Sequence, residues 1–300
     1  MTVRPGPQLR GFGASVAGWG TEGGESRRPD LPWRHTRDPW AVLVSETLAQ
    51  QTQLSRVVPA YHRVLAEFPD PATCAAAPLG DVLRAWEGMG YNRRAKNLHG
   101  AARAIVADHH GAVPDDLDAL LTLPGVGPYT ARAVLAFAFG RDVGVVDTNA
   151  GRVIARGVAG RPVGATEAQA TVDAMVPPGG GWAFGQALLD LGATVCTSRD
   201  PDCGSCPVRR RCRWWAAGRP GPDPARGSAG VSVPQARFAG SERQGRGRLM
   251  AALRSGPVTC GGLASAAGWP DDPVRALRVA DRLVAEGLAT RDRAGTLRLP

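Results

Sequence analysis

Lysine is nearly absent from this sequence of 300 residues, because Lys96 is the only one among 36 basic side chains. No apolar run approaches the roughly 18 residues that a membrane span requires, so a membrane protein is not expected. The N-terminal stretch has no continuous apolar core, which argues against a secretory signal peptide. Hydrophobic residues still make up 43% of the chain, enough for a folded core. We therefore expect a cytoplasmic protein.

The charge is strongly unbalanced. The 36 basic and 27 acidic side chains give a formal charge of +9, almost all of it from arginine. Such a balance favours a polyanionic partner, with nucleic acid first among the candidates. A solvated basic surface without a partner is the alternative at this point.

Cysteine is scarce and unevenly placed. Of the six cysteines, four fall within seventeen residues, at the spacing C-x6-C-x2-C-x5-C. Clustering inside an apparently cytosolic chain favours metal ligation over a disulfide framework. Four thiolates suit either an iron–sulfur cluster or tetrahedral zinc, and the single C-x2-C favours a [4Fe–4S] cluster, since zinc ribbons usually have two such pairs. The candidate ligands are Cys196, Cys203, Cys206 and Cys212.

The hydrophobic pattern is helical over most of the chain. From Pro39 to Phe68 apolar residues recur at spacings of three, four and seven, after an N-cap and N1 signal at Asp38-Pro39. Strand signals are nearly absent from the body, where Val143–Val146 is short and indicates an extended connection. The pattern predicts an all-α protein.

Composition divides the chain into four parts. Three short helices followed by two short strands around Arg293-Ala294-Gly295 are typical of a winged helix near the C-terminus. Gly, Pro and charged residues dominate the segment before that unit, which indicates a linker. The parts are a mobile tail over 1–30, a helical body over 31–215, a linker over 216–236 and a small winged-helix-like unit over 237–300.

A glycine-containing hairpin separates two helical stretches at Leu123–Ala131. Gly125 and Gly127 permit a tight turn, and the next helix exposes backbone N–H groups that can bind a phosphate. A plain helix–turn–helix connection is the alternative. A dinucleotide-binding loop is disfavoured, because no strand precedes the segment and the third glycine is missing.

Two carboxylates stand out. Asp147 follows Val145-Val146 and directly precedes a helix, so it either caps that helix or serves chemistry beside it. Glu46 has the apolar neighbours Leu43 and Val44, which disfavours a simple solvent-facing glutamate. A buried carboxyl group acquires the raised pKa that a general acid needs.

Together these motifs resemble the endonuclease III superfamily of DNA glycosylases, from Leu31 to Trp215. The stretch SETLAQQTQ at 45–53 is similar to that of the adenine-specific, MutY-type branch, with Ala49 in place of the usual leucine. Tyr129 stands where members that also cut the DNA backbone have a lysine. The resemblance implies two domains, a six-helix barrel over 48–146 with a helix-hairpin-helix and an iron–sulfur domain formed by 31–47 plus 147–215.

The resemblance also implies a monofunctional enzyme that hydrolyses the glycosidic bond of adenine paired with 8-oxoguanine or guanine in duplex DNA. Glu46 would protonate the base and Asp147 would stabilise the oxocarbenium ion, with Asn149 orienting Asp147 and Tyr129 beside them. Matching positions imply an adenine pocket of Leu31, Trp33, Arg34 and Gln186, insertion of Gln51 and Tyr91 into the duplex, and DNA contacts by Gly125, Gly127, Arg209 and Arg210.

The C-terminal part departs from the family. About 60 residues follow Gly240, too few for the Nudix-like domain that recognises 8-oxoguanine in many relatives, and the Phe238–Leu253 stretch is similar to the short tail of actinobacterial members. We expect a monomer that acts on nucleoid DNA, whose small unit partly replaces the missing domain. The alternatives are a thymine or oxidised-pyrimidine glycosylase of the same superfamily and a non-catalytic iron–sulfur DNA-binding regulator.

Overall fold

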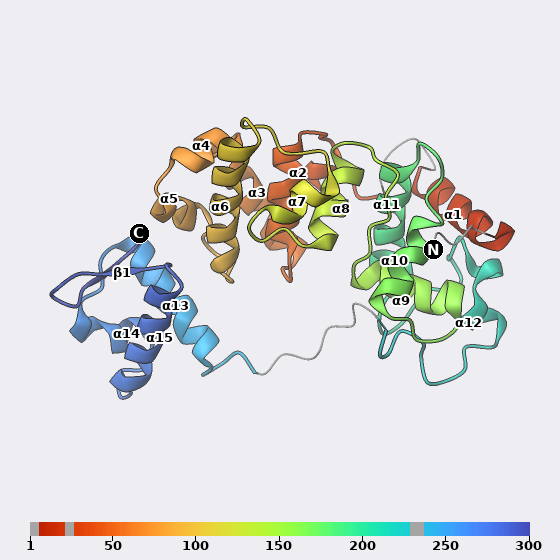
Figure 1. The fold of residues 1–300 in the computed structure, drawn as a ribbon. Helices are drawn as coiled ribbons and strands as arrows, with labels where there is room; N and C mark the ends of the chain where they lie inside the picture. Colours follow the sequence, from red (N-terminus) through yellow and green to blue (C-terminus); the bar gives the residue numbers. More distant parts are fainter. Residues whose placement is uncertain (1–5, 22–26, 229–236) are drawn as a thin grey trace. The chain divides into compact units, whose positions relative to one another are not determined.

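The computed structural model describes residues 6–21, 27–228 and 237–300 (Figure 1). It divides into two compact units. The first comprises Met1–Val42, Asp115–Leu121 and Val126–Val233, and the second comprises Leu43–Pro114, Thr122–Gly125 and Pro234–Pro300. Both are built mainly from helices, which confirms the predicted fold class. Within the described residues, no helix is both long and apolar enough to cross a membrane.

The first unit holds the cysteine loop and Asp147. Its core is formed by buried residues of several helices and of the turn after α10, among them Ile154, Met175, Phe184 and Leu188. Its helices are α1 (Pro7–Gly20), the start of α2 (Pro39–Ala49), α7 (Leu117–Thr122), α8 (Pro128–Phe137), α9 (Thr148–Val153), α10 (Ala165–Asp173), α11 (Gly181–Asp190) and α12 (Arg213–Ala216), with π-helical turns at Ile154–Ala159 and Leu191–Val195 and 3-10 turns at Pro32–Arg34 and Arg209–Arg211.

The predicted mobile tail is wrong for residues 7–20, which form α1. This helix packs against α11 and buries Phe12 and Val16 in the core of the first unit. Its glycines allow a close approach, because a Cβ at Gly13 would meet the Met175 carbonyl oxygen at 2.3 Å and one at Gly20 would meet Ala187 at 2.3 Å. The glycine-rich composition that indicated a loop is therefore a packing requirement.

The second unit contains the remaining helices of the body and the C-terminal unit. Arg94, Ala95, Leu98 and Ala102 lie on the buried face of its longest helix. Its elements are the end of α2, α3 (Leu54–Glu67), α4 (Pro71–Ala76), α5 (Leu79–Ala85), α6 (Arg93–Asp108), α13 (Glu242–Ser255), the 3-10 turn Cys260–Gly262, α14 (Leu263–Ala267), α15 (Pro273–Ala285), β1 (Thr290–Arg291) and β2 (Leu297–Arg298).

The C-terminal unit has the predicted order of three helices and a hairpin. The strands β1 and β2 pair antiparallel, with Thr290 opposite Arg298, and Val258 bridges to Leu297. Helix α15 is strongly amphipathic and buries Ala276, Val279 and Leu283. The winged-helix-like arrangement predicted for 237–300 is therefore present.

The division of the body differs from the predicted one. Helix α8 falls in the first unit, whereas the prediction assigned it to the barrel of 48–146. The helical pattern from Pro39 to Phe68 is also interrupted at Gln50–Gln53, where Gln51 adopts a φ of 51°. The apolar spacing continues across this turn, so periodicity does not reveal it.

The described part of the predicted linker, residues 216–228, is not a free connection. Residues 216–228 pack on the first unit, where Ala225 and Ser228 are buried and the Ser228 Oγ accepts a hydrogen bond from the Val163 backbone N–H. Asp223 pairs with Arg156 at 2.5 Å. The rest of the predicted linker, 229–236, lies outside the described residues, as do 1–5 and 22–26 of the predicted tail.

Candidate functional site

Asp147 is the N-cap of α9. Its Oδ1 accepts hydrogen bonds from the backbone N–H groups of Asn149 and Ala150, both at 2.8 Å, and its Oδ2 accepts one from the Asn149 side-chain amide, also at 2.8 Å. Burial raises the pKa of Asp147, although these hydrogen bonds act in the opposite direction. The aspartate is thus a helix cap and also an oriented, partly desolvated carboxyl group.

Arg152 fixes the orientation of Asn149. Its Nη2 donates to the Asn149 Oδ1 at 2.8 Å and to the Gly192 carbonyl at 2.6 Å, and its Nε donates to the Cys196 carbonyl at 2.7 Å. With its oxygen held by Arg152, Asn149 turns its NH2 toward Asp147. The carboxylate is therefore connected to the first cysteine through two side chains.

Glu46 lies near the end of α2, with 8% of its surface exposed, as its apolar neighbours indicate. The last carbonyl groups of this helix have no partners within it. The Arg94 Nη1 binds the carbonyls of Thr47, Leu48 and Gln50 at 3.0, 2.9 and 2.7 Å. A cation at this end also suits the helix dipole. Arg94 therefore fixes the helix end that presents Glu46.

The glycine hairpin follows α7. Gly125 has a φ of +78°, and a Cβ there would lie 2.6 Å from the Cβ of Asn97, so any other residue would be strained and crowded. Gly127 is the N-cap of α8, Pro128 is its first residue, and no side chain caps the helix. The backbone N–H groups at this end are consistent with the predicted phosphate contact.

Tyr129 is the second residue of α8 and is half-buried. Lys96 lies on α6, where its Nζ donates to the Glu286 carbonyl of the C-terminal unit at 2.5 Å. The lysine is thus engaged by a backbone group in the second unit.

The four residues predicted to surround adenine belong to the first unit. Leu31 and Arg34 are buried, Trp33 is half-buried, and Gln186 on α11 is 6% exposed. The Arg34 Nη2 donates to the Asp190 Oδ1 at 2.7 Å, and Asp190 lies one turn after Gln186 on the same helix. The structure therefore brings the 31–34 segment against the helix that carries Gln186.

Gln51 and Tyr91 share two unusual properties. Both side chains are exposed, and both residues have positive φ, 51° for Gln51 and 44° for Tyr91. Non-glycine residues rarely adopt this conformation, and such strain is concentrated at functional sites. Both residues lie in the second unit.

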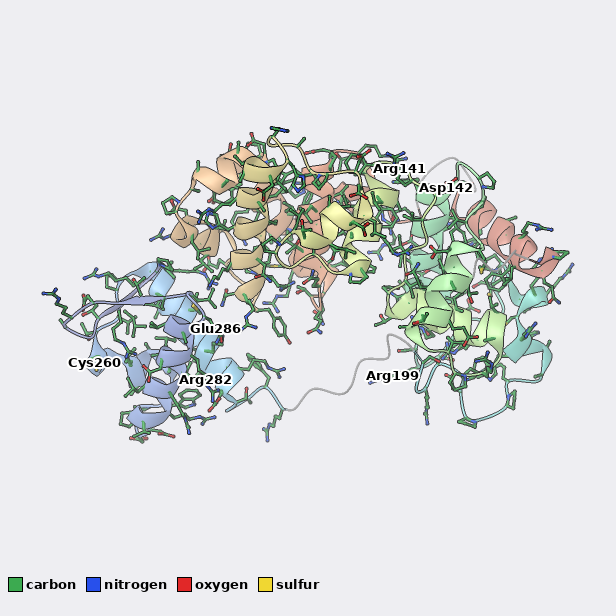
Figure 2. The ribbon with its side chains drawn as sticks, viewed as in Figure 1. Arg141, Asp142, Arg199, Cys260, Arg282 and Glu286 are labelled. Carbon is green, nitrogen blue, oxygen red and sulfur yellow. The ribbon has the colours of Figure 1, made fainter. Side chains whose placement is uncertain are left out.

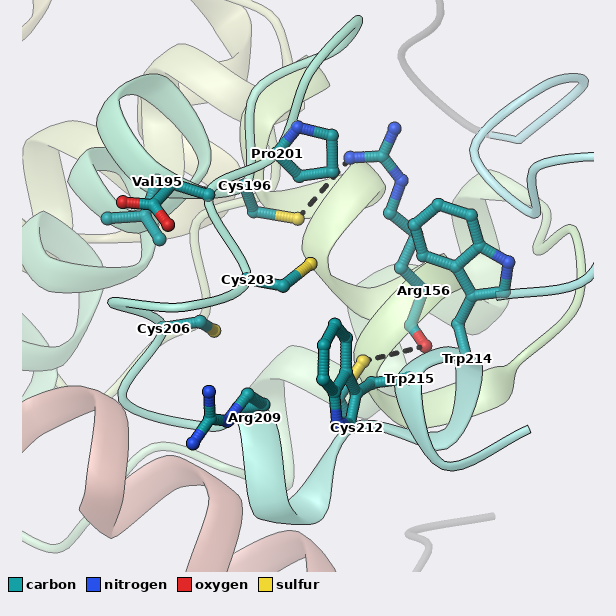
Figure 3. Close-up of a pocket in the computed structure, with 11 residues that line it drawn as sticks. Arg156, Val195, Cys196, Pro201, Cys203, Cys206, Arg209, Cys212, Trp214 and Trp215 are labelled. Carbon is teal, nitrogen blue, oxygen red and sulfur yellow. Dashed lines mark hydrogen bonds between the residues drawn. The ribbon is translucent and has the colours of Figure 1, made fainter. Parts of the chain in front are cut away.

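The four clustered cysteines line one hollow (Figure 3). Figure 3 shows their sulfur atoms around a common space, between the 196–206 loop and α12. All four are free thiols, and burial raises the pKa of Cys206 to about 11. Among the described residues, no group of three or more His, Cys, Asp or Glu side chains is arranged to hold a single metal ion. Four thiolates around one hollow are a donor set that iron–sulfur clusters and zinc both accept.

Arg156 is the main support of this hollow and is 1% exposed. It donates to the Cys196 Sγ at 3.5 Å and to the Thr197 carbonyl at 2.7 Å, and it stacks on Trp214. The carboxylate of Asp223, in the segment predicted as linker, accepts hydrogen bonds from the Arg156 guanidinium and balances its charge. The cysteine loop is thereby tied to the helix that begins beside Asp147.

The predicted DNA-contacting arginines follow the third cysteine. Arg210 is exposed, whereas Arg209 is half-buried over Trp215 and lines the hollow. Only Arg210 therefore has the free surface position expected of a phosphate contact.

Sequence reasoning missed the residues that support the site. Arg152 and Arg156 stand one helical turn apart directly after Asp147, and Arg94 lies on the buried face of α6. Arginine at apolar helix positions was the available signal, since a buried guanidinium requires several acceptors.

Comparison with known proteins supports the motifs. Residues 44–177 match the family model described as HhH-GPD superfamily base excision DNA repair protein. A curated protein of Mycobacterium tuberculosis, named adenine DNA glycosylase, is 45% identical over 285 residues, covering 90% of this chain and 89% of its own length.

Solved structures show the same fold. A thermostable thymine-DNA glycosylase has a TM-score of 0.63 at 29% identity, covering 70% of this chain and 97% of its own. A trapped covalent complex of endonuclease III with DNA has a TM-score of 0.59 at 26% identity, covering 73% of this chain and 100% of its own.

Proposed function

The chain belongs to the adenine DNA glycosylases of the HhH-GPD base-excision repair superfamily, and we propose that it hydrolyses the glycosidic bond of adenine opposite 8-oxoguanine or guanine. The enzyme class, a DNA N-glycosylase, follows from the family. The identity of the mispair, the roles of the residues and the presence of the cofactor are what we propose.

Asp147 acts on the sugar. Departure of adenine leaves positive charge on C1′, and an ionised carboxylate beside it lowers the energy of that transition state. The hydrogen bonds from Asn149 and Ala150 orient Asp147 before the reaction, so little reorganisation is needed as the charge develops.

Glu46 acts on the base. Adenine is a poor leaving group until N7 is protonated, and a buried carboxyl group is suited to donate that proton. The same carboxylate can then accept a proton from the attacking water. Leu31, Trp33, Arg34 and Gln186 would form the pocket that receives the base.

The reaction ends with an abasic site. Strand cleavage by this superfamily's lysine route needs an amine beside the hairpin, where this chain has Tyr129. The only lysine, Lys96, is bonded to the Glu286 carbonyl. We therefore assign a monofunctional reaction. Gln51 and Tyr91 would be inserted into the opened duplex. The hairpin at Gly125 and Gly127, together with Arg210, would contact DNA phosphates.

Cys196, Cys203, Cys206 and Cys212 would hold a [4Fe–4S] cluster. The donor set and the hollow fit such a group, which thiolate ligands would hold. The cluster would brace the loop that presents Arg210. We expect the enzyme to act as a cytoplasmic monomer on nucleoid DNA.

The observation that carries this proposal is the carboxylate of Asp147, held by three N–H donors at the start of α9. Single-turnover base release from duplexes with A:8-oxoG, A:G, A:C and T:G pairs tests it. We expect adenine release from the first two, abolished in Asp147→Asn and Glu46→Gln, with strand breaks only after alkali. Thymine release from T:G would contradict it, as would binding without base release.

A further inference from the structure

The C-terminal unit is fastened to the helices α5 and α6 of the same compact unit. The Gly80 N–H donates to the Pro300 carbonyl at 3.0 Å, and the Lys96 Nζ donates to the Glu286 carbonyl at 2.5 Å. Glu286, which Figure 2 labels, also accepts hydrogen bonds from Arg246 of α13 at 2.9 and 2.5 Å. The winged-helix-like unit is therefore docked by several specific bonds.

One docking contact reaches the loop that carries Tyr91. From α13, the Arg254 Nε donates to the Leu83 carbonyl at 2.8 Å, and its Nη2 donates to the Asn92 Oδ1 at 2.7 Å. Leu83 lies in the last turn of α5 and Asn92 directly precedes α6, so the two acceptors flank the loop between these helices. One guanidinium from the C-terminal unit thus spans the base of this loop.

The same loop is held from the body by other arginines. Arg63 of α3 donates to the carbonyls of Ala85 and Glu87, both at 2.8 Å, and Arg56 donates to the Gly88 carbonyl. Arg94 of α6 contacts the Met89 carbonyl at 3.3 Å. The loop is therefore fixed through its backbone, almost residue by residue.

This support explains how Tyr91 keeps its conformation. A non-glycine residue with a φ of 44° persists only where its surroundings hold the backbone. Asn92 follows it directly, is 4% exposed, and begins α6 without a side-chain cap bond of its own. Its side chain is instead held by Arg254, so Arg254 acts on the residue next to the strained one.

We propose that Arg254 is a positioning residue, through which the C-terminal unit holds Tyr91 where the duplex is opened. The inference rests on the proposed function, because it assigns Tyr91 to insertion beside the extruded base. The C-terminal unit then contributes to opening the duplex through the protein rather than by reading the lesion. The contribution is the same for adenine opposite 8-oxoguanine and opposite guanine.

The test uses the full chain with Arg254→Ala, Asn92→Ala and the double variant. Arg248→Ala is the matched control, since it removes the same charge from an exposed position of α13. A 2-aminopurine base beside the target adenine reports local unstacking by its fluorescence, and single-turnover rates at saturating enzyme report base release. Dissociation constants are measured in parallel, so that loss of opening is distinguished from loss of binding.

We expect the rate of base release to fall about tenfold in both single variants, which is the scale of one charge-assisted hydrogen bond. Both should also lose most of the fluorescence increase. The double variant should lose no more than either, and Asn92→Asp should retain the rate, because the bond to Arg254 persists. In a Tyr91→Ala background, Arg254→Ala should have no further effect. Arg248→Ala should match the wild type.

Asn92 lies outside the C-terminal unit, so an Asn92→Ala defect cannot come from unfolding that unit. Wild-type opening and rate in Arg254→Ala would overturn the proposal, as would a defect in Arg254→Ala that Asn92→Ala lacks. An effect confined to the 8-oxoguanine duplex would overturn it too. A wild-type protein that opens the duplex without releasing adenine would instead refute the proposed function and leave this inference intact.

Discussion

Replacing Arg94 with methionine tests whether one buried guanidinium supports the helix end beside Glu46. The substitution keeps the length of the side chain and removes its donors. The carbonyls of Thr47 and Leu48 would lose a buried donor, at about 1–3 kcal/mol each. Burial lowers the pKa of Arg94 to about 10, so the folded protein disfavours this charge, and part of the loss returns when the charge is removed.

We expect a net loss of about 2 kcal/mol in the free energy of unfolding. Base release should fall more than affinity, because the end of the helix that carries Glu46 loosens. Equilibrium urea unfolding of Arg94→Met gives the first quantity, and single-turnover rates with dissociation constants give the second.

The control is Arg93→Met, which removes the neighbouring exposed arginine of the same helix. It should change stability by less than about 0.5 kcal/mol. Arg94→Met as stable as the wild type would refute the reasoning, and so would equal losses in the two variants. Arg94→Lys should lose about as much stability as the methionine variant. A single ammonium group cannot reach both the carbonyls at the end of α2 and the Met89 carbonyl in the loop before α6.

Three further predictions follow from the first unit. Because burial raises the folded pKa of Asp147, stability falls as the pH rises from the ordinary aspartate pKa through the folded pKa, and the cost is complete above it. Asp147→Asn should therefore abolish base release yet raise the melting temperature at about pH 7, with a gain that shrinks toward about pH 4. The wild-type rate should fall on the acid side at a pH above the ordinary aspartate pKa, because Asp147 must be ionised and burial raises its pKa. A fall at or below the ordinary value would refute the role of Asp147 in stabilising the oxocarbenium ion. Cys206→Ser should lose the visible absorbance and bound iron of purified protein, whereas Cys260→Ser, at an exposed cysteine outside the hollow, should retain both.

The sequence was sufficient for features that depend on local spacing. The cysteine interval, the hairpin glycines and the carboxylate before α9 each predicted a local arrangement that the structure contains. The same holds for the three helices and hairpin at the C-terminus, whose turn at Gly295 is a strong local signal.

The failures concern contacts between distant segments. Composition indicated a mobile tail for residues 7–20, but Gly13 packs closely against Met175 and Gly20 against Ala187. The bond between Arg254 and Asn92 joins positions 162 apart in sequence, and no periodicity reports such a pair. Long-range hydrogen bonds of arginine therefore had to come from the structure.

The engagement of Lys96 makes the chain open to chemical footprinting. A protein with one lysine offers a single side chain to acylating reagents, and here its ammonium group is half-buried against the Glu286 carbonyl. Its rate of acylation therefore reports how often the C-terminal unit lifts from α6. Mass spectrometry of one tryptic site, with and without DNA, would follow that motion without any introduced label.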